Sequence, residues 1–163
     1  MTTKFVETHA IEGSGVPVDI NGAGHVGDYY NMKYYGKCIF ILQQGAVGGV
    51  ATPAVTLLQA TSAAGAGAKA LSFTKRWTKV ALTGTVFTET AVASDTYNQP
   101  AVANTMNVLE VDAEELDTDN GFTYVSVNVA DPAGAGYFLS VQAVLADPRY
   151  SGAPGTHLPN PKV

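Results

Sequence analysis

One short stretch has the spacing of a phosphate-binding glycine motif, so its context along the chain decides whether it could bind a nucleotide. Residues 22–27, GAGHVG, fit the pattern G-x-G-x-x-G. In a dinucleotide-binding fold the last glycine opens a helix, and an acid about 20 residues later binds the ribose. Here the tyrosine-rich stretch 29–35 follows, and the next acid after Asp28 is Glu89. The match therefore predicts no nucleotide site and no cofactor.

A second stretch, residues 112–121, carries the oxygen ligands that calcium prefers. Aligned as an EF-hand loop that starts at Glu115, it has Asn120 in place of the required glycine and Ser126 in place of the closing glutamate. Two interpretations stay open. One is a calcium site of another shape, and the other is an acidic turn in which Asn120 and Gly121 supply the geometry.

The remaining reactive side chains do not form a catalytic set. His9, His25 and His157 lie near the chain ends, without a partner at metal-ligand spacing and without a nucleophile motif. Cys38 lies in the most apolar run, where cysteine is usually a small buried hydrophobe. A single cysteine also excludes an intrachain disulfide and a cysteine-based zinc site. We therefore assign no catalytic, cofactor-binding or metal-ligating residue and predict that the protein is not an enzyme.

The most unusual aromatic feature is the run 28–36, which contains Tyr29, Tyr30, Tyr34 and Tyr35. Tyrosine combines an apolar ring with a polar hydroxyl, so it suits protein interfaces and sugar-stacking platforms alike. The structural alternative is a strand whose rings cover the open end of a sandwich. The sequence leaves these three interpretations open.

Charge is segregated along the chain, although the net charge is only −5. Residues 1–28 carry −3, residues 29–88 carry +6 without an acid, and residues 89–147 carry −10 without a base. Such blocks either pair within one fold or steer association with a charged partner. Lys75 and Arg76 of the basic block are candidate interface residues for the second case. Nucleic acid is not an expected partner, because the basic block is sparse and the whole chain is acidic.

Short apolar runs separated by glycine-rich turns predict an all-β domain. Residues 38–42 are apolar on both faces and predict a central strand buried on two sides, followed by a turn at 43–49. A helix over 54–71 competes with a strand and loop, but Gly65 and Gly67 would each destabilise it by ~1 kcal/mol. Further strands are predicted at 55–60, 76–82, 85–93, 105–111, 122–130 and 137–145. This spacing predicts two packed sheets, a β-sandwich or jelly roll.

The chain of 163 residues suits a single core, which we place at residues 29–150. Residues 1–28 show no sustained period and contain Pro17, which suits an extended N-terminal arm or a loosely attached strand. Residues 151–163 contain three prolines and predict an extended C-terminal tail. The first residues lack the apolar core of a signal peptide, and no run reaches the ~18 apolar residues of a membrane span. We therefore expect synthesis in a cytoplasm and no membrane partner.

Four stretches cover most of the predicted domain: DYYNMKYYGKCIFILQQGA, VTLLQATSAAGAGAKALSF, VLEVDAEELDTDNGFTYVSVNVADP and YFLSVQAVLADPRYSG. Together they resemble small virion structural proteins of tailed bacteriophages, in particular capsid decoration (cement) proteins. The resemblance spans about residues 28–152. It implies a β-sandwich that binds the outside of an assembled icosahedral shell, often as a trimer at local symmetry axes, with no catalysis and no cofactor.

The resemblance predicts a non-enzymatic protein of the virion that binds the major capsid protein and copies of itself, stabilises the capsid surface, and is made in the host bacterial cytoplasm. Residues 2–27 are expected to reach onto the capsid or onto neighbouring subunits, with Thr2, Phe5 and Val6 as candidate interface residues. The alternative is a carbohydrate-binding or adhesin-type β-sandwich module, such as a head fibre or tail component, in which the four tyrosines of 28–36 form a stacking platform.

Overall fold

The computed structural model describes residues 4–49, 52–81, 83, 86–134, 136–149 and 158–163, and nearly all of its regular structure is β. Its strands are, in chain order, β1 (Ala10–Asp19), β2 (His25–Val26), β3 (Tyr30–Asn31), β4 (Tyr35–Val47), β5 (Ala54–Ala60), β6 (Lys69–Ala70), β7 (Phe73–Lys79), β8 (Thr88–Ser94), β9 (Thr96–Asn98), β10 (Met106–Asp112), β11 (Tyr124–Val129) and β12 (Tyr137–Pro148). A short helix, α1 (Phe5–Thr8), precedes β1, and two 3-10 turns, η1 (Ala113–Glu115) and η2 (Thr118–Asn120), lie between β10 and β11. The prediction of an all-β protein is confirmed.

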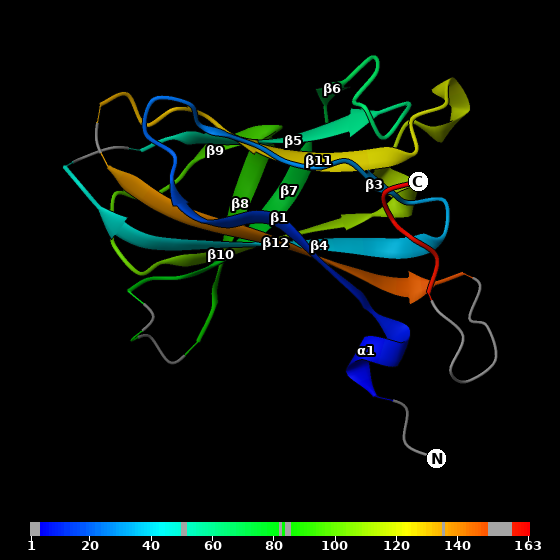
Figure 1. Ribbon diagram of the computed structural model, residues 1–163, viewed down its shortest axis with the longest axis horizontal. Coiled ribbons are helices and arrows are strands. Elements are labelled where there is room, and N and C mark those ends of the chain that lie inside the picture. Colours follow the sequence, from blue (N-terminus) through cyan, green and yellow to red (C-terminus); the bar gives the residue numbers. More distant parts are fainter. Residues whose placement is uncertain (1–3, 50–51, 82, 84–85, 135, 150–157) are drawn as a thin grey trace.

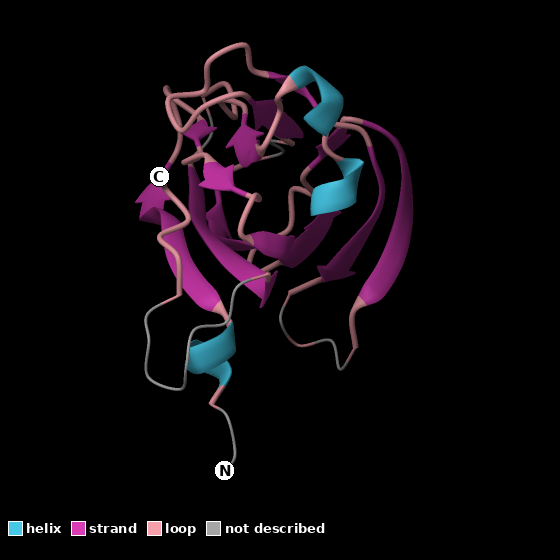
Figure 2. Cartoon of the chain, turned by 90° about the vertical axis from the view of Figure 1, so that its right-hand side faces the viewer, coloured by secondary structure: helices cyan, strands magenta, loops and turns pink. Residues whose placement is uncertain are grey.

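The strands form two antiparallel sheets that pack on each other as a sandwich (Figure 1). The larger sheet has the strand order β1-β12-β4-β10-β7-β8. The smaller sheet has the order β2-β11-β5-β6, with β3 also paired to β11 and β9 to β5. In the view of Figure 2 the strands enclose a common interior, and the helix next to the N-terminus lies outside it. The prediction of a β-sandwich is confirmed.

Strand β4 lies inside the larger sheet, between β12 and β10. Cys38, Phe40 and Leu42 point into the sandwich and have no exposed surface. Ile39 and Ile41 alternate with them on the opposite face and are only half-buried. The prediction that this strand is buried on two sides is therefore wrong for the outer face, because the second sheet covers only the inner one.

Strand β4 also continues to Val47, through most of the stretch 43–49 for which the sequence predicts a turn. Gln43 is paired with Met106 of β10 on one side and with Ser140 of β12 on the other. A strand held by ladders on both edges continues through polar residues, because its backbone groups keep their hydrogen-bond partners. The turn prediction is therefore wrong up to Val47.

The segment 54–71 forms a strand and a loop rather than a helix. Residues 54–60 form β5, and the chain then turns through Gly65 and Gly67, whose φ angles are +75° and +63°. Positive φ does not occur in a right-handed helix and is easily adopted only by glycine. The preference for a strand and loop over a helix is confirmed.

The remaining predicted strands correspond to β7, β8, β10, β11 and β12, with ends displaced by up to three residues. Every second residue of β12 faces the core. The core-facing residues of this strand are Tyr137, Leu139, Val141, Ala143 and Leu145. Those of β11 are Val125, Val127 and Val129. Because successive side chains of a strand point to opposite faces, period-2 alternation identifies the inner face of both strands.

Residues 1–28 contribute to both sheets. Strand β1 pairs along β12, from Ala10 opposite Leu145 to Asp19 opposite Phe138, and β2 pairs with β11. Of the two sequence interpretations of this segment, the attached strand therefore describes β1 and β2. The helix α1 projects from the end of β1 (Figure 1).

The glycine-rich residues 22–27 have a packing role. A Cβ on Gly27 would lie 2.4 Å from the carbonyl oxygen of Val127, and one on Gly24 would lie 2.6 Å from that of Val129. Neither contact is tolerable, so glycine is what lets the chain lie directly against β11. The resemblance of this stretch to a dinucleotide motif is explained by close backbone packing.

Part of the predicted C-terminal tail lies against the sandwich. Residues 151–157 lie outside the described residues, whereas 158–163 are described and Pro161 among them is buried. The backbone N–H of Asn31 donates a hydrogen bond to the carbonyl oxygen of Pro161 at 2.6 Å. The end of the chain is therefore docked on the domain.

Candidate interaction surface

The candidate interface residues near the N-terminus lie on α1. Thr2 lies outside the described residues. Phe5 and Val6 are 56% and 66% exposed, and the Phe5 ring stacks on His9 with the ring centroids 4.0 Å apart. Two large apolar side chains are therefore presented to solvent beside the larger sheet.

The four tyrosines of the run 28–36 do not form one exposed platform. Tyr30 and Tyr35 have no exposed surface, and the Tyr30 ring lies 6.1 Å from that of Phe40 in the core. Burial raises the pKa of both phenols. Tyr29 and Tyr34 are half-buried. Two of the four rings therefore fill the interior, as in the structural alternative, and they cannot stack on a sugar while the domain is folded.

Lys75 and Arg76 are adjacent on β7 but serve opposite faces of the sheet. Lys75 is exposed, and its ammonium lies 3.1 Å from the carboxylate of Glu89. Arg76 points inward, where its guanidinium donates to Asn107 Oδ1 at 2.9 Å and lies 4.6 Å from the centroid of the Tyr97 ring. Lys75 is thus exposed, whereas Arg76 is half-buried and its contacts stabilise the interior.

Arg76 belongs to a polar network inside the sandwich that the sequence does not reveal. Thr78 Oγ1 donates to Asn107 Oδ1 at 2.7 Å, and the amide of Asn107 donates to Gln99 Oε1. These three residues are buried. Buried polar groups destabilise a fold unless they are hydrogen-bonded, so this network depends on mutual satisfaction. It joins β7 and β10 to the segment that follows β9.

The outer face of the larger sheet carries apolar side chains on five neighbouring strands, together with polar ones such as Gln142, opposite Ile41, and Glu110, opposite Ile39. We call this region the outer sheet face. Its apolar residues are Ile11 of β1, Phe138 and Val144 of β12, Ile39 and Ile41 of β4, Met106 and Val108 of β10, and Trp77 of β7. Those of β4, β10 and β12 lie on the side opposite the core, because their neighbours along the strand are buried. Trp77 precedes the buried Thr78, and Ile11 is paired with Val144, so these two share the same face.

Cross-strand pairing brings these side chains into rows. Ile11 lies opposite Val144, which lies opposite Ile39. In the next row Ile41 lies opposite Val108, which lies opposite Trp77. Directly paired residues have Cβ atoms about 5 Å apart, so each row is a continuous apolar contact surface.

The composition of the outer sheet face is unusual for a sheet with one solvated side. Antiparallel sheets generally present polar residues to water and apolar residues to the core. Here Ile11 is 52% exposed and Phe138 46% exposed, and charged pairs such as Lys37–Glu110, at 3.1 Å, flank the rows. Apolar patches rimmed by polar residues are typical of interaction surfaces. The outer sheet face could not be predicted from the sequence. An apolar run such as 38–42 has the same pattern whether its second side packs on a core or is available to a partner.

The segregated charges pair within the fold. Lys37, Lys69 and Lys75 of the basic block form ion pairs with acids of the block 89–147, while Lys162 pairs with acids of the block 1–28. These contacts favour the interpretation in which the halves of the chain neutralise each other. Because the pairs are substantially exposed, each contributes only about 0–1 kcal/mol to folding.

The acidic stretch 112–121 is engaged in local hydrogen bonds. The Asp117 carboxylate accepts hydrogen bonds from Lys69 and from the Asn120 amide, which hold the pKa of Asp117 below its usual value. Gly121 follows with a φ of +83°. Among the described residues, no group of three or more His, Cys, Asp or Glu side chains is placed to hold a metal ion. This geometry is that of the acidic turn.

Two further titratable side chains are buried to different degrees. Cys38 is fully buried, and burial raises the pKa of its thiol, so it is the packed hydrophobe that the sequence predicts. His25 is half-buried against β1, where a Cβ on Gly15 would lie 2.6 Å from its ring. Burial lowers the pKa of His25 below 6.5, although the nearby Asp28 carboxylate opposes this shift. Neither Cys38 nor His25 is arranged as a nucleophile with its general base.

Comparison with known proteins does not assign this chain to a family. Neither a scan against models of protein families nor a search of curated protein sequences finds a match to this chain. Within the described ranges, no helix has the length and apolar character needed to cross a bilayer. The chemistry of the outer sheet face is therefore the guide to its partner.

Proposed function

We propose that the protein is a non-enzymatic structural protein of a tailed-phage virion, which binds the outer surface of the assembled capsid and stabilises it. The observation that carries this proposal is the outer sheet face, where apolar side chains of five strands lie side by side and charged pairs flank them. The resemblance of residues 28–152 to capsid decoration proteins supplies the class of partner, which is the major capsid protein.

The dimensions of the outer sheet face suit protein docking. Five strands spaced about 4.8 Å apart make a face about 20 Å wide. Along the 13 residues of β4 this width offers the roughly 800 Å² per partner that a stable interface buries. Apolar area removed from water contributes about 25 cal/mol per Å², which is offset in part by the loss of rotational and translational freedom.

The exposed side chains of α1 lie next to the same sheet, because α1 contacts β1 and β12. Phe5 and Val6 lie beyond the end of β1, whose Ile11 begins the first apolar row. A partner that covers the sheet and meets α1 would remove all three side chains from water. Binding of this kind stabilises the folded protein and the shell together, because a ligand that binds only the native state shifts folding by mass action.

Co-sedimentation tests the proposal. The purified protein, at micromolar concentration, is mixed with expanded capsids that are assembled from the major capsid protein of the same phage and lack this protein. We expect the wild-type chain to pellet with the capsids. Ile41→Asp should reduce the bound fraction at least tenfold, because it places a charge in the centre of a desolvated interface.

The matched control is Leu58→Asp. Leu58 is also half-buried, but it lies on the outer side of the smaller sheet, opposite Ser126. Circular dichroism verifies that both variants remain folded. Failure of the wild-type chain to pellet, or equal loss of binding in the two variants, contradicts the proposal.

A further inference from the structure

The C-terminal residues 158–163, LPNPKV, lie on the sandwich as a short peptide with a turn at residues 161–162, and the peptide is held through its carbonyl groups. The backbone N–H of Asn31 donates to the carbonyl oxygen of Pro161 at 2.6 Å, and its side-chain amide donates to that of Val163 at 2.8 Å. The Tyr35 hydroxyl donates to the carbonyl oxygen of Pro159 at 2.6 Å. The three carbonyls belong to every second residue of the peptide, so its main chain is held along its length.

The groups that hold the peptide are fixed by the fold. Tyr35 has no exposed surface, and Asn31 is 6% exposed. Asn31 is further oriented because its Oδ1 accepts a hydrogen bond from the backbone N–H of Lys33 at 3.0 Å. Donors that are already held in place lose little conformational freedom when a ligand binds.

The chemistry of the peptide matches these donors. Proline has no N–H, and the domain offers Pro159 and Pro161 hydrogen-bond donors for their carbonyls. The fixed φ of proline also restricts the peptide before binding, which lowers the entropy lost on docking. Pro161 is buried in the contact. A short, proline-containing segment is therefore the class of ligand that this place accepts.

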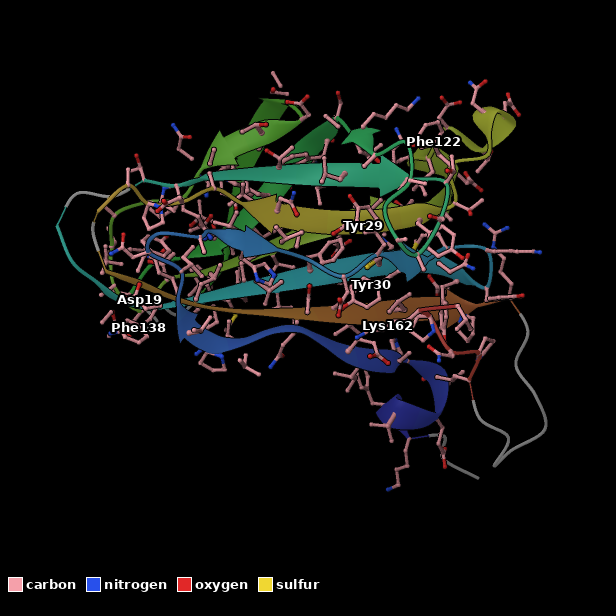
Figure 3. All side chains as sticks on the ribbon, turned by 45° about the horizontal axis from the view of Figure 1, so that its top comes forward. Asp19, Tyr29, Tyr30, Phe122, Phe138 and Lys162 are labelled. Carbon is pink, nitrogen blue, oxygen red and sulfur yellow. The ribbon has the colours of Figure 1, made fainter. Side chains whose placement is uncertain are left out.

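Ion pairs make the site selective for the residue that follows Pro161, which is Lys162. The Lys162 ammonium lies 2.8 Å from the Asp28 carboxylate and 3.6 Å from that of Glu12, and 5.8 Å from the centroid of the Tyr30 ring (Figure 3). The hydrogen bond to Asp28 raises the pKa of Lys162. A basic residue after the second proline is thus recognised by two acids.

All of the groups that hold the peptide come from the segment 12–35, far from the tail in sequence. The tail is joined to Arg149, which follows β12, by the eight residues 150–157. Nine extended Cα steps span up to about 30 Å, which is about the diameter of a small domain. This length of chain lets the peptide of one copy reach a neighbouring copy.

We propose that Glu12, Asp28, Asn31 and Tyr35 form a recognition site for a Pro-x-Pro-Lys peptide, and that the tail of a second copy of this chain occupies it when copies assemble. The exchanged tail makes the same contacts as the chain's own tail, so exchange between copies loses no contact at the site. A high local concentration of copies then favours the exchanged form. This proposal does not depend on the capsid as the partner.

Charge reversal in full-length chains tests the exchange. Asp28→Lys gives a chain with an altered site and a normal tail, and Lys162→Glu gives a chain with a normal site and an altered tail. Each chain repels its own tail, but each tail suits the other chain's site. Native mass spectrometry of the equimolar mixture should show a ratio of heterodimer to homodimers about threefold to tenfold above the ratio of the statistical 1:2:1 distribution, as expected for pairs that are partly exposed.

The control is the double variant Asp28→Lys with Lys162→Glu, in which the chain's own tail suits its own site again. This chain should show no more dimer than the wild-type protein. A statistical distribution in the mixture, or the absence of dimers, overturns the role of the second copy. High salt should reduce the heterodimer excess, since the pair is screened.

A labelled LPNPKV peptide tests the recognition site separately. Fluorescence anisotropy should show that it binds the Lys162→Glu chain several-fold more tightly than the Asp28→Lys chain, and that LPNPEV shows the opposite preference. Equal binding of both peptides by both chains, or no binding to either chain, overturns the recognition site. Asp28 is exposed, with 51% of its side-chain surface accessible, so neither result is explained by loss of folding.

Discussion

The two faces of strand β4 have the same kind of side chain and opposite surroundings. Phe40 and Leu42 point inward and have no exposed surface, while Ile39 and Ile41 point outward and are half-buried. The inner pair is sufficient to anchor the strand in the sandwich. Folding alone does not require isoleucine on the outer face, because a polar residue is equally compatible with a solvated sheet. The difference separates residues that hold the fold together from residues that are available to a partner.

Truncation on the inner face should give the largest effect. Phe40→Ala removes a ring that contacts Tyr30 in the core and leaves a cavity. We expect the free energy of unfolding to fall by about 3–5 kcal/mol. Chemical denaturation monitored by circular dichroism measures this loss. A loss below about 1 kcal/mol would show that the inner face of β4 is not the packed core described above.

Asn107, a buried polar residue of β10, tests whether the stability of the interior depends on hydrogen bonds as well as on packing. Asn107→Ala removes the partner of Arg76, Thr78 and Gln99 and leaves their buried groups without it. We expect a loss of about 2–3 kcal/mol in the same assay, because an unsatisfied buried group is destabilising. An unchanged midpoint would mean that the network contributes nothing to stability.

Truncation on the outer face should have a smaller effect on folding. Ile41→Ala removes methylene groups that are already half in water. We expect a loss of about 1 kcal/mol or less, since the buried apolar area is smaller and no closed cavity forms. The comparison with Phe40→Ala, one residue away, controls for strand propensity. A loss as large as that of Phe40→Ala would remove the distinction between the two faces.

The smallest effect concerns His25, at the edge where β2 of the smaller sheet meets β1 of the larger one. Burial lowers its pKa below 6.5, so the folded state favours the neutral ring. Its contribution to stability is complete above pH 6.5 and is lost progressively as the pH falls from 6.5 through the lowered pKa. Unfolding free energies of the wild-type chain and of His25→Gln, measured on both sides of pH 6.5, should diverge in slope. If the unfolding free energies of the two proteins had the same dependence on pH, the His25 ring would be solvent-exposed in the folded state.

The sequence predicts those parts of the fold that depend on local alternation. Val125, Val127 and Val129 recur every second residue, and this period alone identifies the inner face of β11. Gly65 and Gly67 likewise decide against a helix through their own backbone preferences. The existence of these strands and the identity of their inner faces therefore follow from neighbouring residues alone.

Features that depend on a distant partner do not follow in this way. Lys75 and Arg76 look alike in the sequence, and only the register of β7 on β10 separates a surface ammonium from an interior guanidinium. Tyr30 and Tyr35 have the composition of an interface, but their burial is set by tertiary packing. The outer sheet face has the same origin, since five strands must be placed side by side before their isolated apolar residues become one surface.

The pairing of the first strands with the last ones has a consequence for biogenesis. β1 lies on β12, and β2 lies on β11, so each N-terminal strand meets a partner about a hundred residues or more downstream. A nascent chain on the ribosome has no template for these strands until nearly all of the sequence has emerged. Non-local topology of this kind slows folding, because loop closure must precede the contacts that reward it. The first strands of this domain are thus secured only after its last strands have been made.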